Sequence, residues 1–565
     1  MNILGIWDGH DSGAAVVRDN RVLAAVNEER LSRRKLEIEF PERSIKACLD
    51  LIGATPGDIR HIAVSTSDFS KTLTRLFPKL KEEYYQIRRR KKTPGTATHI
   101  KKAAKYKLTE IGPSGITRYV SEIILRKRLG LLGFRDFSLS FIDHHYCHAA
   151  AAAFCSGFSE CAVLTLDGIG DGLSGTISVF SNGTMERVHD IPGNSSLGIF
   201  FEHVTNLMNM RELEDEGKVM ALATYSYPID DAENPLNDFF RIKGTDITAK
   251  YSALKMFEEL KKVLWRYPSE QFAWLAQRML ELRTTGLVGN IMKETGKRNL
   301  AVAGGVFSNV KANMLIRELP EVDNLFVFPH MGDGGLALGA AFCANYDCCG
   351  ITKYELSDIF WGPGYDDRTV EEALRKNGLS FAMNRDIART TAGLIATGEI
   401  VFWVQGRMEY GPRALGHRSI LAPAGSELIK DRLNMELKMR VWYQPFCPSI
   451  LEEDSRVCFE PFKGKPDRFM TTAYRVRPEF RGRLKGVTGK DGTCRPQMVD
   501  AWDGNYFSLL LELKKLTGIG VVLNTSLNLH GEPLVCSPED AVKTFIKTNC
   551  KYMAIGNYLV EKSSI

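Results

Sequence analysis

The sequence lacks the features of membrane, secreted and disulfide-scaffold proteins. No run approaches the roughly 18 apolar residues that are needed to cross a bilayer, and Met1–Trp7 has no basic region ahead of its short apolar run. The 12 cysteines include no Cys-x-x-Cys pair and are too few for a disulfide scaffold in 565 residues. We therefore expect a cytoplasmic protein that makes no membrane contact and has more than one hydrophobic core.

A strong net charge is also lacking, and the small excess is concentrated in one segment. The chain has 74 Lys and Arg against 68 Asp and Glu, a formal net charge of +6. Residues 71–130 hold 17 Lys and Arg against 4 Asp and Glu, which leaves 57 against 64 elsewhere. This basic segment, which includes Arg88–Lys92, Lys101, Lys102 and Lys105, is first interpreted as a solvated, helical or mobile insertion. Attraction of a phosphate-bearing ligand or a nucleic acid is the second interpretation.

Two distant parts of the chain share one pattern. The start reads as the strand Ile3–Trp7, a polar loop and the strand Ala14–Val17. The same order returns as the strand Ala162–Leu166, the loop Asp167–Gly172 and the strand Thr176–Phe180. The sequence therefore predicts an internal duplication of a strand, an Asp-Gly loop and a second strand.

Glycine-rich turns follow the strands in which a ligand site is expected. Gly170, Gly172 and Gly175 match a dinucleotide fingerprint, but that fingerprint needs a helix next, and β-branched residues follow instead. A glycine-rich hairpin can still hold phosphate through its backbone N–H groups. A further turn at 303–309 opens a helix, and a helix N-terminus favours anionic groups, so we expect nucleotide contact there. Two such hairpins, one per half, resemble the plan of actin, hexokinase and Hsp70.

The regular helix and strand patterns end after the predicted helix Leu336–Ala344, which is rich in small residues. A turn-rich stretch containing Trp361–Gly364 follows, and helix and strand patterns resume at Ala388–Thr397 and Ile400–Val404. We predict a first domain over residues 1–350, a connector over 351–384 and a separate α/β domain over 385–565.

Three histidines within five positions indicate a metal site. His144 and His148 lie at i and i+4 at the start of an alanine-rich stretch, so a helix would present both imidazoles on one face. Two imidazoles make half a site, and oxygen ligands would complete a site for Fe, Mn or Zn. Asp167 and Asp333, each at a glycine-rich turn, are the predicted partners.

Taken in chain order, the motifs are similar to those of one enzyme family. The metal-site pattern resembles that of the tRNA threonylcarbamoyl transferases, and the whole chain resembles the NodU/CmcH-type O-carbamoyltransferases. The motifs that carry this resemblance are Gly9-His10-Asp11, Glu28-Glu29-Arg30-Leu31-Ser32-Arg33-Arg34-Lys35, the histidine pair, Glu216-Gly217-Lys218-Val219-Met220, Gly304-Gly305-Val306, Gly406-Arg407-Met408-Glu409-Tyr410-Gly411-Pro412-Arg413, Pro445-Phe446-Cys447-Pro448-Ser449 and Leu523-Asn524-Thr525-Ser526.

The resemblance implies two active sites on two folds. The first domain would be actin-like, with duplicated β-hairpin lobes, and would use a divalent metal, expected to be Fe²⁺, to transfer a carbamoyl group to a hydroxyl. The second would be a YrdC-like α/β domain that makes carbamoyl adenylate from carbamoyl phosphate and ATP, with Mg²⁺ accompanying the nucleotide. The acceptor would be a hydroxylated small molecule, as in the tailoring of antibiotics and other natural products.

The resemblance also suggests roles for individual residues. His10 is the candidate general base, and Lys35 and Lys218 would contact phosphate or carbamoyl oxygens. The predicted nucleotide contacts of the first domain are Gly168, Gly170, Gly172, Gly304, Gly305 and Asn309. The predicted contacts of carbamoyl phosphate and ATP in the second domain are Arg413, Arg418, Lys438, Arg440, Arg495, Asn524 and Ser526. One departure is Gln444, which stands where the family commonly has Arg.

Two other functions are weighed against this one. An actin-like small-molecule kinase would need neither the histidine pair nor the arginines of the second domain. A tRNA threonylcarbamoyl-type transferase would use the basic segment, although the net charge gives no reason to expect a nucleic-acid partner. The sequence does not identify the acceptor, and it leaves a homodimer open.

Overall fold

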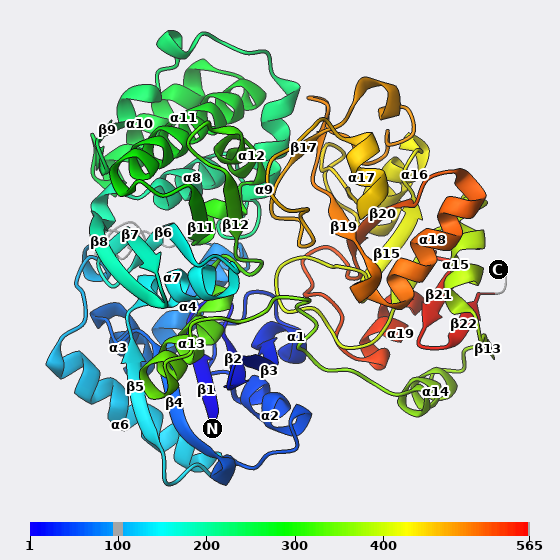
Figure 1. Ribbon diagram of the computed structural model, residues 1–565, viewed down its shortest axis with the longest axis horizontal. Helices are drawn as coiled ribbons and strands as arrows, with labels where there is room; N and C mark the ends of the chain where they lie inside the picture. Colours follow the sequence, from blue (N-terminus) through cyan, green and yellow to red (C-terminus); the bar gives the residue numbers. More distant parts are fainter. Residues whose placement is uncertain (94–105, 563–565) are drawn as a thin grey trace. The chain divides into compact units, whose positions relative to one another are not determined.

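The computed structural model describes residues 1–93 and 106–562, which form two compact units (Figure 1). Unit 1 comprises residues 1–28 and 37–355, and unit 2 comprises residues 29–36 and 356–565. The division falls between Glu355 and Leu356, so most of the predicted connector belongs to unit 2. That stretch contains α14 (Asp367–Lys376) and β13 (Phe381–Met383). None of the described helices is long and apolar enough to span a bilayer.

Unit 1 contains two five-stranded sheets and a small hairpin. The first sheet, in the order β3-β2-β1-β4-β5, consists of β1 (Asn2–Trp7), β2 (Gly13–Arg18), β3 (Arg21–Asn27), β4 (Ile59–Ser65) and β5 (Ser138–Ile142). The second, in the order β12-β11-β6-β7-β8, consists of β6 (Glu160–Gly170), β7 (Leu173–Ser181), β8 (Thr184–Pro192), β11 (Asn299–Ala303) and β12 (Asn324–Val327). The hairpin pairs β9 (Phe240–Lys243) with β10 (Asp246–Ala249).

The two sheets have the same topology, as the predicted duplication requires. In each, three consecutive strands form an antiparallel meander, and two later strands extend the sheet in parallel from the first strand of that meander. The second loop is shorter than predicted, because β6 continues to Gly170 and only Asp171 and Gly172 form the turn. Both turn residues have positive φ, 53° and 86°, as expected for a two-residue hairpin turn between twisted strands.

Two helices of unit 1 pack between its sheets. α13 (Leu336–Cys349) packs on β1, β2 and β4, α7 (His144–Cys155) packs on β6 and β11, and the two helices contact each other (Figure 1). Glycines allow this close approach. A Cβ on Gly5 would lie 1.9 Å from the Ala337 carbonyl oxygen, and one on Gly339 would lie 2.2 Å from the Cys147 carbonyl oxygen. The loops that precede α7 and α13 are thereby brought together.

Unit 1 also contains α2 (Glu42–Leu51), α3 (Phe69–Leu76), α4 (Pro78–Arg88), α6 (Gly115–Leu131), α8 (Leu197–Leu207), α9 (Glu216–Leu222), α10 (Ala253–Arg266), α11 (Ser269–Thr295) and α12 (Val310–Glu318). The basic segment accordingly contributes α3, α4 and α6. Lys101, Lys102 and Lys105 lie outside the described residues.

Unit 2 is built on one eight-stranded mixed sheet in the order β13-β22-β21-β14-β15-β20-β16-β19. Besides β13, its strands are β14 (Val401–Val404), β15 (Arg418–Pro423), β16 (Cys447–Leu451), β19 (Gln497–Val499), β20 (Val521–Ser526), β21 (Tyr552–Ile555) and β22 (Tyr558–Glu561). A small ribbon pairs β17 (Tyr474–Arg475) with β18 (Thr493–Cys494). The helices are α1 (Glu28–Ser32), most of which lies in this unit, α14, α15 (Ile387–Ala396), α16 (Glu427–Arg432), α17 (Glu452–Cys458), α18 (Asn505–Thr517) and α19 (Pro538–Ile546).

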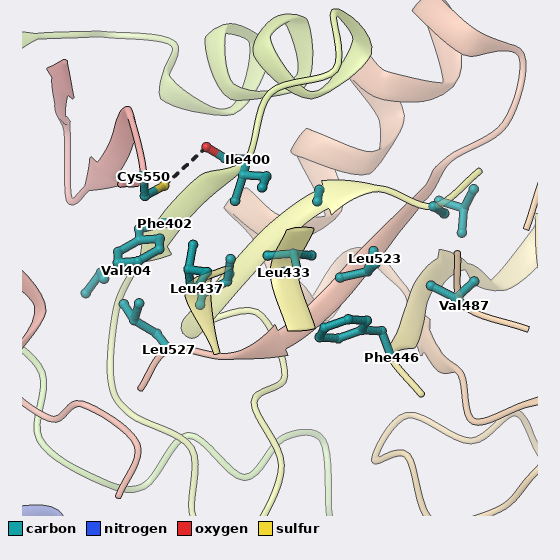
Figure 2. Packing of buried hydrophobic residues seen from close by; sticks show 14 of the residues in the cluster. Ile400, Phe402, Val404, Leu433, Leu437, Phe446, Val487, Leu523, Leu527 and Cys550 are labelled. Atoms are coloured by element: carbon teal, nitrogen blue, oxygen red, sulfur yellow. Dashed lines mark hydrogen bonds between the residues drawn. The ribbon is translucent and has the colours of Figure 1, made fainter. Parts of the chain in front are cut away.

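Both faces of the unit 2 sheet are buried. Successive residues of a strand point to opposite faces, and along β14 Val401 and Trp403 join the cluster under α15 and α18. Phe402 and Val404 join the cluster on the other face, together with Leu523 of β20 (Figure 2). This burial on two faces explains why the β14 strand is a continuous apolar run rather than an alternating one.

Candidate functional site

The four predicted metal ligands lie together in unit 1. The side chain of Asp143 caps α7 by accepting a hydrogen bond from the Tyr146 N–H at 2.7 Å, and His144 and His148 follow one turn apart. Asp167 lies near the end of β6, and Asp333 lies in the short turn that leads into α13. One ligand atom from each of the four residues lies within 4.8 Å of every other. The packing of α7 against α13 therefore brings the predicted cluster together.

The atoms converge as the donors of a metal site do. His144 Nε2 lies 3.2 Å from Asp167 Oδ2 and 3.6 Å from Asp333 Oδ1, and His148 Nε2 lies 3.4 Å and 3.5 Å from the same two oxygens. Both histidine side chains are nearly fully buried, and His148 Nε2 has no hydrogen-bond partner of good geometry among the described residues. Two imidazoles and two carboxylates are a donor set that suits a divalent cation.

The electrostatics of the cluster favour a positive charge at its centre. Burial lowers the pKa of His144, but the charges of Asp333 and Asp167 outweigh burial and raise this pKa to about 10. Burial would raise the pKa of Asp167, yet its interactions with His144 and His148 hold it well below its usual range. A bound divalent cation would satisfy the same two carboxylates and take the place of protons on the imidazoles.

The third histidine of the motif has a structural role. His145 Nδ1 lies 3.0 Å from Thr165 Oγ1, and His145 Nε2 lies 3.0 Å from the Leu173 carbonyl oxygen. Burial, together with the neighbouring histidines, lowers the pKa of His145 to about 3. Its ring therefore ties α7 to β6 and β7 and is directed away from the cluster.

His10 lies beside the metal cluster, as its predicted role requires. His10 Nδ1 is 3.2 Å from Asp333 Oδ2, and the indole N–H of Trp7 donates to the His10 carbonyl oxygen at 2.8 Å. Burial lowers the pKa of His10 to about 4, so the imidazole is neutral near pH 7. The Trp7 ring also contacts His144 edge-on, with ring centroids 5.9 Å apart.

The glycine-rich turns border the same cluster. A Cβ on Gly170 would lie 2.3 Å from the His144 ring, and the Gly305 N–H donates to Asp167 Oδ1 at 3.0 Å. Gly304, with φ of 105°, passes so close to Leu166 that a Cβ would lie 2.2 Å from its carbonyl oxygen. Gly170, Gly304 and Gly305 therefore allow the close packing that positions the predicted metal ligands. Gly172, with φ of 86°, is instead a residue of the hairpin turn. Gly168 is less crowded, since a Cβ there would lie 4.0 Å from the Ile199 side chain.

Asn309 and Lys218 are engaged within the protein. The Asn309 side chain caps α12 and exchanges two hydrogen bonds with the Gln277 amide, at 2.8 Å and 3.0 Å. Lys218 Nζ lies 2.7 Å from Asp215 Oδ1, and both side chains are largely buried. Their predicted ligand contacts remain predictions, and neither side chain is part of the metal cluster.

Part of the basic segment packs inside unit 1, whereas other cations of the segment, such as Arg90, Lys91 and Lys92, are exposed as the solvated interpretation predicts. Arg75 forms a bidentate ion pair with the Asp8 carboxylate, with hydrogen bonds of 2.8 Å and 2.9 Å. Lys71 Nζ lies 3.9 Å from the same carboxylate and 4.0 Å from the centroid of the Trp7 ring. Lys81 donates to the Asp8 carbonyl oxygen. Three cations thus surround the loop between β1 and β2, next to the cluster that contains His144.

Arg88 and Arg89, further along the basic segment, also form ion pairs within unit 1. Arg88 pairs with Glu202 and Glu212, and Arg89 pairs with Glu214. The interpretation as a solvated insertion is therefore wrong for these residues, although the helical part of it is confirmed. Composition shows the cations but not their acidic partners, which lie more than 100 residues further along the chain, so sequence reasoning missed this packing.

A second group of predicted residues converges in unit 2. Lys438 Nζ donates to the Ser526 and Asn528 carbonyl oxygens at 2.6 Å and 2.9 Å and to Asn528 Oδ1 at 2.7 Å. Burial, with the charges of Arg440 and Lys35, holds the pKa of Lys438 well below its usual range. Lys35 is therefore close to Lys438, in unit 2 and not in the domain for which it was predicted.

Three arginines lie beside these lysines with few partners of their own. Arg440 Nε donates to Asn434 Oδ1 at 2.6 Å, while Arg440 Nη2 and Arg413 Nε are buried without a hydrogen-bond partner in the described part of the chain. Arg495 contacts the Cys447 sulfur. Burial and the charge of Arg495 lower the pKa of Arg413 to about 9. Such a concentration of partly buried cations without acidic partners is typical of a site that binds an anion.

The other predicted residues of unit 2 support the backbone. The Arg418 guanidinium donates to the carbonyl oxygens of Cys536, Gln405 and Pro363, among others. The Asn524 amide donates to the Ala414 carbonyl oxygen and Ser449 Oγ. Contacts of either side chain with a substrate therefore remain predictions, while Gln444 Oε1 is buried without a partner in the described residues.

Comparison with known proteins identifies the family. Residues 2–342 match the model of the carbamoyltransferase N-terminus, and residues 392–562 match that of the carbamoyltransferase C-terminus. Nodulation protein NolNO of Sinorhizobium fredii is 34% identical over 98% of this chain and 79% of its own length. An uncharacterised protein of Methanocaldococcus jannaschii is 30% identical over 99% of both chains, and nodulation protein U of Rhizobium tropici is 37% identical over 42% of this chain and 39% of its own.

The comparisons identify a carbamoyltransferase. The chain belongs to the NodU/CmcH-type carbamoyltransferase family, as the resemblance indicated. Likeness to solved structures is weak. Component A of (R)-2-hydroxyglutaryl-CoA dehydratase from Acidaminococcus fermentans aligns with 61% of this chain and 97% of its own at 13% identity and a TM-score of 0.34. HypF of T. kodakarensis aligns with 62% of this chain and 48% of its own at 15% identity and a TM-score of 0.33.

Proposed function

We propose that the protein is an ATP-dependent O-carbamoyltransferase with two half-reactions. In unit 2, which we propose to be YrdC-like, carbamoyl phosphate would lose phosphate to water, and the carbamate formed would attack the α-phosphorus of ATP. This step yields carbamoyl adenylate and releases pyrophosphate. In unit 1, proposed to be actin-like, an acceptor hydroxyl would attack the carbamoyl carbon, and AMP would leave.

The observation that carries the proposal is the group of partly or fully buried cations in unit 2. Arg413, Arg440 and Arg495 have no carboxylate partner in the described residues, and Lys438 and Lys35 lie close by. Joining carbamate to ATP brings several negative charges together, so catalysis needs fixed cations more than it needs a covalent nucleophile. Hydrogen-bond donors and cations already held in place stabilise such charge at little reorganisation cost.

The residues of unit 1 suit the second half-reaction. His144, His148, Asp167 and Asp333 would hold a divalent metal, with Fe²⁺ as the expected ion, and the metal would neutralise phosphate charge as AMP leaves. His10 is neutral near pH 7 and lies 3.2 Å from Asp333. It would accept the proton of the acceptor hydroxyl, and Asp333 would then stabilise the imidazolium.

The test separates the two half-reactions in the full-length chain. With carbamoyl phosphate and ATP, the protein should release pyrophosphate and form carbamoyl adenylate. Arg440→Met should reduce pyrophosphate release about a hundredfold or more, since a lost charged donor costs about 3 kcal/mol. His148→Ala should retain this step and lose transfer. Lys46→Met, an exposed residue of α2, serves as the matched control.

Two results would reject the scheme. Release of ADP instead of pyrophosphate would indicate a kinase, and an equal loss of both half-reactions in the two variants would contradict the division between units. The acceptor is proposed to be a hydroxylated small molecule, to be sought by the mass gain of one carbamoyl group in a screen of hydroxylated metabolites. A tRNA acceptor is less favoured, because Arg88 and Arg89 of the basic segment are paired internally.

A further inference from the structure

Cys447 lies within the cation group of unit 2. It is the first residue of β16, opposite Asn524 of β20, and its side chain is 7% exposed. Its sulfur lies 3.2 Å from Arg495 Nε and 3.0 Å from Arg495 Nη2. The sulfur thus accepts contacts from two N–H groups of one guanidinium.

Two further guanidiniums act on the same sulfur. Arg440 stacks on Phe446, the preceding residue, with 4.2 Å between the guanidinium carbon and the ring centroid. The charges of Arg413 and Arg440 both interact with Cys447, and both arginines are repelled by Arg495. Arg413 Nε and Arg440 Nη2 are buried and have no hydrogen-bond partner in the described residues. Cys447 thus lies among three arginines, and two of their N–H groups have no acceptor in the described residues.

We propose that Cys447 is a peroxide-sensitive modification site whose oxidised form occupies the anion site of unit 2. The thiol sulfur attacks one oxygen of hydrogen peroxide and the O–O bond breaks, which gives a sulfenic acid and water. A second peroxide oxidises the sulfenic acid to a sulfinic acid and releases a second water. Sulfur is oxidised by two electrons in each step, and each peroxide is reduced by two electrons.

The sulfinic acid formed at Cys447 would be an anion placed among three arginines. A sulfinic acid is ionised near neutral pH, and its two oxygens supply the acceptors that Arg413 Nε and Arg440 Nη2 lack. The sulfinate would bind the same arginines that are proposed to bind carbamoyl phosphate. Oxidation would therefore block substrate binding and stop pyrophosphate release. This consequence, unlike the oxidation itself, rests on the proposed function of unit 2.

The experiment uses the full-length protein with Cys348→Ser and Cys349→Ser, since these two cysteines are exposed and would react first. The protein is treated with hydrogen peroxide, with and without inorganic phosphate, and each cysteine peptide is followed by mass. Cys155 is the matched control, because it is equally buried and burial alone raises its pKa. We expect Cys447 to gain oxygen first, and phosphate to slow this gain.

A second variant tests the role of the cations directly. Arg495→Gln should slow oxidation of Cys447 about tenfold, because the sulfur loses a charge-assisted partner, while the rate at Cys155 stays unchanged. Oxidation of Cys155 as fast as Cys447, or the same Cys447 rate in the variant, would overturn the proposal. An absence of phosphate protection would place the modified sulfur outside an anion site and would also overturn it.

The two proposals can fail separately. If Cys447 is oxidised selectively in a protein that never releases pyrophosphate, the modification site stands and the proposed function fails. If pyrophosphate is released and peroxide leaves Cys447 unmodified, the proposed function stands and the modification site fails. In a protein that shows both, loss of pyrophosphate release should follow the same time course as the mass gain at Cys447.

Discussion

Replacing Glu216 by Gln tests the electrostatics of unit 1 away from the metal cluster. Glu216 begins α9, and its carboxylate accepts a hydrogen bond from the Leu213 N–H at 2.7 Å. No Lys or Arg pairs with it in the described residues, and Glu202 and Asp215 repel its charge. Burial is the larger effect, and together with these charges it raises the pKa of Glu216 to about 8. The native protein therefore retains a proton here that the unfolded chain loses.

The sign and the magnitude follow from linkage. The ordinary pKa is 4.5, so between pH 4.5 and 8 the unfolded state binds fewer protons than the native state, and stability falls as pH rises. The loss is about 1.4 kcal/mol per pH unit and about 4 kcal/mol between pH 5 and pH 8. A glutamine does not titrate and can keep the hydrogen bond from Leu213. The Glu216→Gln variant should therefore gain about 4 kcal/mol over the wild type across this range.

Urea unfolding at pH 5, 6.5 and 8, followed by circular dichroism, measures this difference. Because the two units can unfold separately, the free energy is taken from the transition that the substitution shifts. Glu270→Gln, which removes an exposed carboxylate from α11 of the same unit, controls for the change of net charge. A difference between wild type and Glu216→Gln that stays constant within about 1 kcal/mol over the three pH values would refute the reasoning.

Three further predictions test other parts of the structure. Asp8→Asn should destabilise unit 1 by about 3–5 kcal/mol in urea unfolding, because the buried Arg75 loses the carboxylate that compensates it. His148→Ala should lose bound divalent metal, as measured by elemental analysis, whereas His145→Gln should retain it because His145 bonds Thr165 and Leu173 instead. Lys35→Met should reduce pyrophosphate release and leave metal content unchanged; a loss of metal would show that Lys35 acts in unit 1.

Local patterns predicted the elements that carry the metal site. The i, i+4 spacing of His144 and His148 reports helix geometry directly, and α7 begins at His144. The strand that leads to Asp167 is a buried apolar run, which is the pattern of a sheet covered on both faces. Asp333 was found only as an aspartate in a glycine-rich turn. Its place in the cluster depends on the close approach of α13 to β1 and α7 at Gly5 and Gly339, which no local pattern encodes.

Charge was the least predictable feature. The cations of residues 71–130 are plain in the composition, but Arg88 owes its burial to Glu202 and Glu212, which are distant in sequence. Arg418 illustrates the reverse case. An arginine in a glycine-rich stretch suggests an anion site, yet its guanidinium is 1% exposed and bonds backbone carbonyl oxygens. Whether a charged side chain serves a ligand or the fold depends on tertiary partners that spacing does not reveal.

The path of the chain limits which experiments can assign the two proposed half-reactions to the units. Residues 29–36 leave unit 1 and belong to unit 2, where Arg30 Nη2 donates to the Gly411 carbonyl oxygen at 2.7 Å and Arg33 donates to the carbonyl oxygens of Pro533 and Leu534. A fragment that starts at Leu356 would lack these hydrogen bonds and the charge of Lys35 next to Lys438. Inactivity of such a fragment would therefore say nothing about which unit forms the proposed carbamoyl adenylate. Point variants in the intact chain keep residues 29–36 in place, and they alone assign each step to a unit.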